Sequence, residues 1–161
     1  MHGCLGFSKG NVMSAHTASA LLREQHEDID FGVQGAMDGS GDPVGLQRSL
    51  DLLRQHLHLE ETVLFPALEG SVGLSIMVME REHGLMWPLI ESLARACRGG
   101  VELGVMQDDL EELFQLLQVH NPKEEQVLYS VADEHSGLAD ALVAAQLPDG
   151  WVCKAVRGKR A

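Results

Sequence analysis

The sequence predicts an all-α protein: an antiparallel up-down-up-down four-helix bundle with a short extra C-terminal helix. Three observations support this prediction. Of the 161 residues, 45% are hydrophobic but only 4% are aromatic, and few β-branched runs occur. No long stretch alternates between apolar and polar residues in the manner of a half-buried strand. Four long segments instead repeat apolar residues at helical spacing and are joined by short loops.

The first helix is predicted over residues 15–34, with Ser14 as its N-cap. Residues 35–41 are rich in Gly, Asp and Ser, which predicts a loop. Four residues at spacings of four, three and four form the inward stripe of this helix, and the second of them is a histidine: Leu22, His26, Ile29 and Val33.

The second helix is predicted over residues 43–65, because Asp42 provides an N-cap and Pro43 suits the first helical position. Pro66 lacks a backbone donor, so the helix should kink or stop there, and a turn is expected at Glu69-Gly70. The inward stripe contains two polar residues among leucines: Leu46, Leu50, Leu53, His56, Leu57, Glu60 and Leu64.

The third helix is predicted over residues 72–97, between Ser71 and the Gly99-Gly100 pair. Pro88 should bend it just past a central histidine. Apart from that histidine, its inward stripe is apolar: Ile76, Met79, His83, Met86, Ile90 and Ala94.

The fourth helix is predicted over residues 103–134, with a local distortion at Pro122, and a short fifth helix is expected over residues 138–147. The chain thus divides into an N-terminal tail (1–13), the bundle (14–134) and a short helix with a basic C-terminal tail (135–161). The fourth stripe again combines leucines with a His and a Glu: Met106, Leu110, Leu113, Leu117, His120, Glu124, Leu128 and Val131.

One ten-residue pattern occurs twice: His, three residues, Glu-Glu, one residue, Val-Leu and an aromatic ring. The first copy runs from His56 to Phe65 and the second from His120 to Tyr129. A His and a Glu four residues apart lie on the same face of a helix. Both can therefore reach one metal ion, or the Glu can bridge to a second ion. Internal repetition argues against a chance pairing on a solvated helix face.

Six polar residues lie on the four inward stripes, and each stripe carries a histidine. Buried polar groups are costly unless they are paired or ligated, so six of them in one bundle core predict metal binding. Imidazole and carboxylate without thiolate suit iron, manganese or zinc. The predicted metal ligands are His26, His56, Glu60, His83, His120 and Glu124.

Six side chains are too many for one tetrahedral zinc ion, so two ions bridged by Glu60 and Glu124 are expected. His26 and His56 would bind one ion and the two later histidines the other, although the pairing could cross. Each ion would then have room for a solvent-derived oxo or hydroxo bridge and for an exogenous ligand.

The segments that contain these residues resemble the hemerythrin-like (HHE cation-binding) family over residues 14–134. The resemblance implies a non-haem di-iron centre in a four-helix bundle. It also implies a role such as oxygen carriage, sensing of oxygen or nitric oxide, or repair of iron–sulfur centres. The segments are Gln25-His26, residues 56–66, Glu82-His83 and His120-x-x-x-Glu124-Glu125.

The oxygen carriers of that family use a fifth histidine, in a His-x-x-x-His pair on the third helix. Here Trp87 lies four residues after His83, and Met79 lies four residues before it. The pattern is instead similar to that of the repair of iron centres proteins, which speaks against reversible oxygen carriage. It implies a di-iron protein that binds a small diatomic ligand for sensing, iron handling or repair. The alternative is a di-iron enzyme of the peroxidase, ferroxidase or nitric-oxide reductase type.

The net charge of −12, from 12 basic and 24 acidic residues, speaks against a nucleic-acid partner. Cys4, Cys97 and Cys153 form neither a disulfide framework nor a Cys-x-x-Cys motif. Neither a signal peptide nor an apolar run of about 20 residues that could span a membrane is recognised. The expectation is a cytoplasmic protein that does not associate with membranes; the sequence does not identify a protein partner.

Other residues near the predicted ligands have two explanations each. Glu61 and Glu125 could be surface residues or could orient a ligand histidine. His58 is expected to face solvent. Met79, Met86 and Trp87 are expected to pack in the core rather than line a ligand channel.

Overall fold

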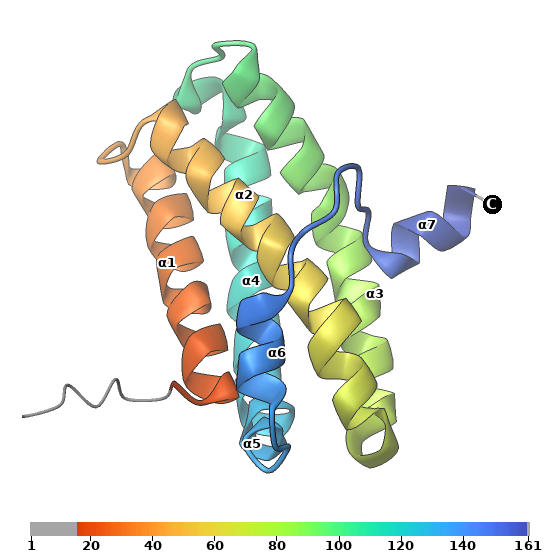
Figure 1. Cartoon of the computed structure of the whole chain (residues 1–161). Helices are drawn as coiled ribbons and strands as arrows, with labels where there is room; N and C mark the ends of the chain where they lie inside the picture. Colours follow the sequence, from red (N-terminus) through yellow and green to blue (C-terminus); the bar gives the residue numbers. More distant parts are fainter. Residues whose placement is uncertain (1–15, 161) are drawn as a thin grey trace, which may run out of the picture.

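The structure, a computed structural model, describes residues 16–160, and these residues form helices and loops without a strand. The all-α prediction is therefore confirmed. The helices of the bundle are α1 (Ala18–Asp38), α2 (Pro43–Leu59), α3 (Phe65–Arg98) and α4 (Gln107–Val127). In the packed arrangement of Figure 1, α1 contacts α2 and α4, and α3 contacts the same two helices.

The first helix begins and ends later than predicted. Thr17, not Ser14, is its N-cap: the Thr17 hydroxyl oxygen accepts a hydrogen bond from the backbone N–H of Ala20 at 3.1 Å. Ser14 lies outside the described residues. The helix passes through the predicted loop to Asp38, because Ala36 is buried in the core, and it ends at Gly39 with φ +82°.

The second helix leaves α-helical geometry before Pro66, so the prediction of a kink or stop at that proline was wrong in position. The chain passes from α2 through the π-helix η1 (Glu60–Leu64) directly into α3. The Phe65 N–H already bonds to the carbonyl of Glu60, five residues earlier, so the backbone leaves the α-helical register before the proline. Within α3, Val72 has non-helical backbone angles (φ −135°, ψ 33°), and two helical parts meet there at a kink. This kink lies two residues beyond the turn predicted at Glu69-Gly70.

The predicted fourth helix is divided into three pieces. A 3₁₀ turn, η2 (Leu103–Met106), precedes α4, and a four-residue helix, α5 (Tyr129–Ala132), follows it. Helix α4 continues through Pro122. The third helix ends at Gly99-Gly100 as predicted, with φ +72° at Gly100.

The C-terminal region contains two short helices, of which the sequence predicted one. Helix α6 (Leu138–Ala144) corresponds to the predicted fifth helix and is three residues shorter. Helix α7 (Lys154–Arg160) was predicted only as a tail. It packs on α3 so closely that a Cβ atom added to Gly84 would lie 2.7 Å from the Cβ of Ala155.

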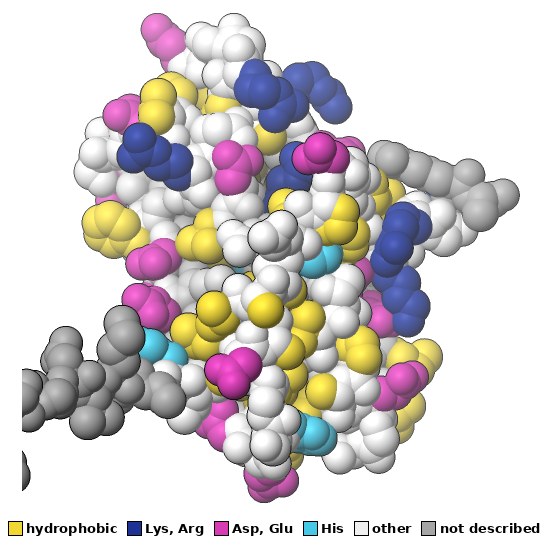
Figure 2. All heavy atoms as spheres, in the orientation of Figure 1, with side chains coloured by type: hydrophobic (Ala, Val, Ile, Leu, Met, Phe, Trp, Pro, Cys, Tyr) yellow, Lys and Arg dark blue, Asp and Glu magenta, His cyan; other side chains and the backbone are white. Residues whose placement is uncertain are grey.

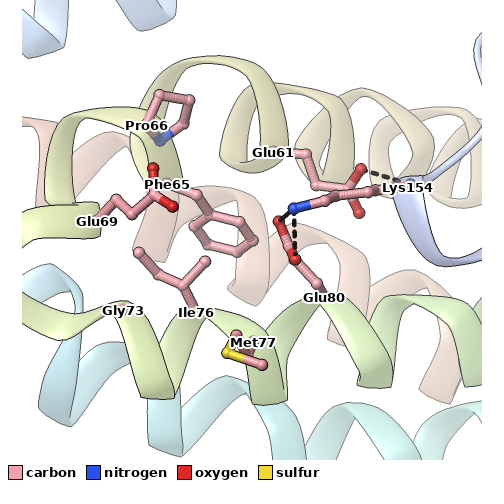
Figure 3. Close-up of a pocket in the computed structure, with 9 residues that line it drawn as sticks. All are labelled: Glu61, Phe65, Pro66, Glu69, Gly73, Ile76, Met77, Glu80 and Lys154. Atoms are coloured by element: carbon pink, nitrogen blue, oxygen red, sulfur yellow. Dashed lines mark hydrogen bonds and ion pairs between the residues drawn. The ribbon is translucent and has the colours of Figure 1, made fainter.

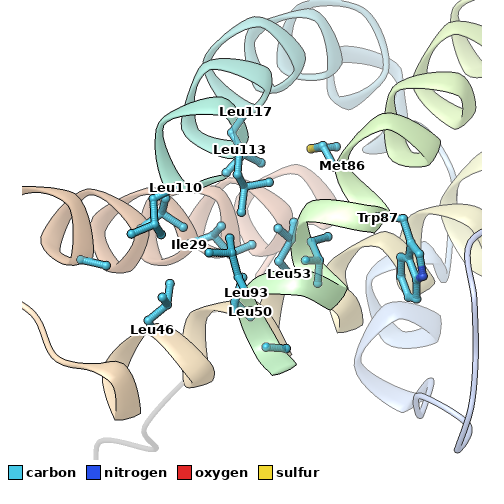
Figure 4. Close-up of a cluster of buried hydrophobic side chains, with 14 of the residues drawn as sticks. Ile29, Leu46, Leu50, Leu53, Met86, Trp87, Leu93, Leu110, Leu113 and Leu117 are labelled. Atoms are coloured by element: carbon cyan, nitrogen blue, oxygen red, sulfur yellow. The ribbon is translucent and has the colours of Figure 1, made fainter. Parts of the chain in front are cut away.

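Two apolar clusters fill the bundle, and a polar layer separates them. Along α1, Leu22 belongs to one cluster and Ile29 to the other, and buried His26 lies between them. The larger cluster, shown in Figure 4, contains leucines of α2 and α4 together with Met86 and Trp87 of α3. Met79, Met86 and Trp87 are buried among these clusters, as predicted. Apolar packing on both sides therefore shields the histidines and glutamates from bulk water.

On the face shown in Figure 2, acidic side chains are spread out rather than gathered in one patch. Within the described residues, one helical stretch, Pro43–Arg98, is long and apolar enough to cross a membrane by length and composition alone. Contrary to the expectation from the sequence, an apolar run of this length is therefore present, and the stretch that contains it contributes α2, η1 and α3 to the bundle.

Candidate metal centre

The structure brings all six predicted ligand residues together in the polar layer. They form two groups of four, and within each group the potential ligand atoms lie within 4.8 Å of one another. Glu60 and Glu124 belong to both groups. The first group adds His26 and His56, and the second adds His83 and His120. The structure therefore groups the four histidines in the way that the uncrossed pairing requires.

Each glutamate presents one oxygen to each group. Glu60 Oε1 lies 3.1 Å from His56 Nε2, and Glu60 Oε2 lies 3.3 Å from His83 Nε2. Glu124 Oε2 lies 3.3 Å from His26 Nε2, and Glu124 Oε1 lies 3.2 Å from His120 Nε2. Both carboxylates are fully buried. This arrangement is the one that two bridging carboxylates require.

The other ring nitrogen of each histidine is held from outside the cluster. Nδ1 of His56 donates to the Gln25 amide oxygen at 2.8 Å, and Nδ1 of His26 donates to a Glu125 oxygen at 2.9 Å. In the second group, Nδ1 of His83 donates to Glu61 at 2.9 Å and Nδ1 of His120 to Glu82 at 2.7 Å. An imidazole whose Nδ1 carries the hydrogen has a lone pair on Nε2, the atom that faces the other ligands.

Three of the four side chains that accept these Nδ1 hydrogen bonds also contact a further residue. Glu125 pairs with the Arg23 guanidinium at 3.3 Å, and Glu82 contacts the Lys123 ammonium. Glu61 Oε2 accepts a hydrogen bond from the backbone N–H of Lys154 at 2.8 Å. The last contact connects the start of α7 to His83 through a single carboxylate.

Tyr129 also belongs to the site, although the sequence indicated it only as the aromatic residue that ends the second repeat. Its side chain is buried, stacks on His26, and donates a hydrogen bond to Glu60 Oε1 at 2.6 Å. The equivalent residue of the first repeat, Phe65, stacks on His83 in the same way, with ring centroids 5.6 Å apart. One aromatic residue therefore accompanies each group, but only one of them carries a hydroxyl.

The ligand atoms of the second group have no hydrogen bonds. Among the described residues, His83 Nε2, His120 Nε2, Glu60 Oε2 and Glu124 Oε1 are buried without a hydrogen-bond partner. These four buried atoms have only one another as close neighbours, at 3.2 and 3.3 Å, so either shared protons or a bound cation must compensate their charge. Two nitrogens and two oxygens also suit iron, manganese or zinc, so the residues present fit a metal.

Buried charge shifts the pKa values of these groups. Burial alone would lower the pKa of His120, but the Glu124 carboxylate outweighs burial and raises that pKa to about 9. Burial and Glu124 favour a higher pKa for Glu60, but His56 and His83 outweigh them and lower it to about 2. Without a metal, protons on imidazoles thus compensate the buried carboxylates, and a bound cation would displace those protons.

A small pocket of about 150 Å³ lies beside the second group. Phe65 lines it together with Glu61, Ile76 and Met77, and the Lys154 ammonium reaches across to Glu80 at 2.8 Å (Figure 3). Because the Phe65 ring also stacks on His83, one aromatic side chain separates the pocket from that histidine.

The structure distinguishes between the two roles that the sequence left open for the residues near the ligands. Glu61 and Glu125 orient histidines. The expectation that His58 faces solvent was wrong: it is buried, and its ring packs edge-on against Trp151 of the C-terminal segment. Burial lowers the pKa of His58.

Two other orienting residues, Gln25 and Glu82, were not predicted, although each directly precedes a predicted ligand. Cys97 and Cys153 are free thiols, and Cys4 lies outside the described residues.

The described fold and site agree with a comparison against protein families. The model of the hemerythrin HHE cation binding domain matches residues 17–132. Searches of curated proteins and of solved structures gave no match. The family match covers α1 to α5, and it includes all six residues of the two groups.

Proposed function

Since this chain belongs to the hemerythrin HHE cation-binding family, we propose that it is a non-haem di-iron protein that binds a small ligand such as oxygen or nitric oxide. One observation carries the proposal. Four imidazole Nε2 atoms and two carboxylates converge, while every Nδ1 is committed to an acceptor outside the cluster. We further propose that the bundle has the up-down-up-down order and that the protein is cytoplasmic.

His26 and His56 would hold one iron, and His83 and His120 the other. Glu60 and Glu124 would each give one oxygen to either ion, as their distances to the four imidazoles support. A bound iron pair would supply one-electron redox chemistry and coordination positions for a small ligand.

The protein's own contribution is orientation and exclusion of water. The Nδ1 hydrogen bonds fix each ring and its tautomer, which increases the basicity of Nε2. The apolar clusters on either side keep the polar layer dry, and burial strengthens every electrostatic interaction within it. The pocket of about 150 Å³ that Phe65 lines has room for a small ligand near His83, on which the Phe65 ring stacks. These features favour sensing, iron handling or iron-centre repair.

The experiment is iron loading of the reduced protein without air, followed by titration with oxygen and, separately, with nitric oxide. We expect about two irons per chain and a change of the visible spectrum with at least one of the two gases. The His56→Ala variant should lose at least one iron. The matched control is His58→Gln, which changes a buried histidine two residues away that has no place in either group.

Unchanged iron content in His56→Ala would contradict the proposed ligand set. Two irons that respond to neither gas would contradict the ligand-binding role and leave the metal site in place. Sustained consumption of hydrogen peroxide or nitric oxide under reducing conditions would favour the enzyme alternative.

A further inference from the structure

We propose that the phenol oxygen of Tyr129 is a fifth protein donor to the metal position formed by His26 and His56, so that the two metal positions are unequal. This inference rests on the proposed di-iron function. It concerns a residue outside the six predicted ligands, at one of the positions where the second repeat differs from the first.

The phenol oxygen lies within 3.5 Å of a potential ligand atom of each residue in the first group. It is 2.6 Å from Glu60 Oε1 and 3.0 Å from His26 Nε2. It is also 3.4 Å from Glu124 Oε2 and 3.5 Å from His56 Nε2. The same four residues form the first potential ligand group. An ion bonded to them at about 2.0–2.2 Å must come close to the phenol oxygen as well.

Hydrogen bonding accounts for this position only while the imidazoles carry extra protons. With Nδ1–H committed to Glu125 and Gln25, the neutral rings of His26 and His56 have lone pairs on Nε2. All four neighbours of the phenol are then acceptors, and one phenolic hydrogen can serve only one of them. Extra protons on the imidazoles can relieve this conflict in the metal-free protein. A cation among the five atoms relieves it completely.

The other group provides the contrast. Phe65 occupies the equivalent place beside His83 and offers no oxygen, and the four ligand atoms there have no hydrogen-bond partner. The first position would thus have five protein donors and the second would have four. More room for an exogenous ligand remains at the second position, on the side of the pocket that Phe65 lines.

Coordination requires a simple proton balance. The phenol O–H bond breaks, the oxygen electron pair forms the bond to the metal, and the proton leaves to bulk water. No electron is transferred. An anionic oxygen donor interacts more strongly with ferric than with ferrous iron, because the ferric charge is larger.

The test uses the full-length protein loaded with ferric iron, in wild-type form and as the Tyr129→Phe variant. Iron per chain, the visible spectrum and resonance Raman spectra are measured on the same samples. We expect a phenolate-to-iron charge-transfer band with tyrosine ring vibrations in the wild type. Tyr129→Phe should lose both signals and keep about two irons, because four donors remain at each position. Phe65→Leu is the matched control, and it should keep the band.

The wild-type Raman spectrum decides the matter even if a variant fails to fold. Two bound irons without tyrosine vibrations would overturn the assignment and leave the di-iron function intact. A band that persists in Tyr129→Phe would also overturn it. Wild-type protein that binds no iron would refute the proposed function and this inference together, and the iron analysis distinguishes that outcome from the others.

Discussion

The two halves of the bundle solve the same problem with different local structure. In the first half, His56 and Glu60 span the junction between α2 and the π-helix η1, and their facing atoms lie 3.1 Å apart. In the second half, His120 and Glu124 lie inside α4 on either side of Pro122, with a separation of 3.2 Å. The four-residue spacing is kept although the backbone differs, which shows that the ligand geometry is the common requirement of both halves.

The two ligand groups differ most in the residues that lie beside their ligand atoms. Tyr129 places a hydroxyl among the ligand atoms of the first group, whereas Phe65 leaves those of the second group without a hydrogen bond. One of the two orienting carboxylates of the second group, Glu61, also accepts a hydrogen bond from the C-terminal segment. The repeat therefore preserves the donors, and the residues beside the donors make the two positions distinct.

The largest expected effect comes from a residue that belongs to both halves. Glu60→Ala should remove both irons, because each group loses one of its four ligand residues and the bridge between the ions. The variant also leaves buried imidazolium without its partner in the metal-free protein, at a cost of about 3–5 kcal/mol in stability. Iron analysis and denaturant unfolding measure the two effects. Retention of two irons would show that Glu124 suffices as the only bridge.

The pH dependence of the metal-free protein should reveal the buried charges. The pKa of His120 is raised to about 9, so its contribution to stability is fully present below pH 6.5 and is lost as the pH rises towards 9. The pKa of Glu60 is lowered to about 2, so its contribution is present above pH 4.5 and is lost as the pH falls towards 2. Thermal unfolding measured from pH 3 to pH 9 should therefore show the greatest stability between about pH 4.5 and pH 6.5.

Metal loading should change that profile. Because a cation replaces the imidazole protons, metal affinity should rise between pH 6.5 and pH 9, and metal binding should release protons. Calorimetry of Zn²⁺ binding in buffers of different ionisation enthalpy measures that release. Binding without proton release at neutral pH would contradict the charge state inferred for His120.

A smaller effect is expected from the residue that orients His83. Glu61→Ala should weaken metal binding by about 10–100-fold, because the His83 ring loses the acceptor that fixes its tautomer. Since Glu61 orients a histidine of the second group, one of the two binding steps should weaken and the other should remain. The matched control, Glu69→Ala, removes an exposed carboxylate that lines the same pocket. Equal effects of both variants would mean that only surface charge had changed.

The sequence alone was sufficient to predict the all-α fold and to select the six residues that converge, because both depend on helical periodicity and on the repeat. It missed Gln25 and Glu82 as orienting residues, although a signal existed. Consecutive residues of a helix point about 100° apart, so a residue adjacent to an inward ligand faces the neighbouring helix. In this structure Gln25, beside His26, serves His56, and Glu82, beside His83, serves His120.

Other features depend on tertiary contacts that no local pattern contains. His58 is buried, and Trp151, 93 positions later, packs against its ring. The place of Pro66 within a continuing helix depends on the π-helical register that precedes it. The position of the Tyr129 hydroxyl follows from how α5 continues from α4, which the uniform helix predicted over residues 103–134 did not show.

The most direct test of the two-ion centre with unequal halves is Mössbauer spectroscopy of the oxidised protein loaded with ⁵⁷Fe, together with iron analysis. The account predicts about two irons per chain and two ferric signals of equal area from a spin-coupled pair. One iron per chain, or the signal of isolated ferric ions, would contradict the two-ion centre. Two irons with a single signal would contradict the difference between the halves.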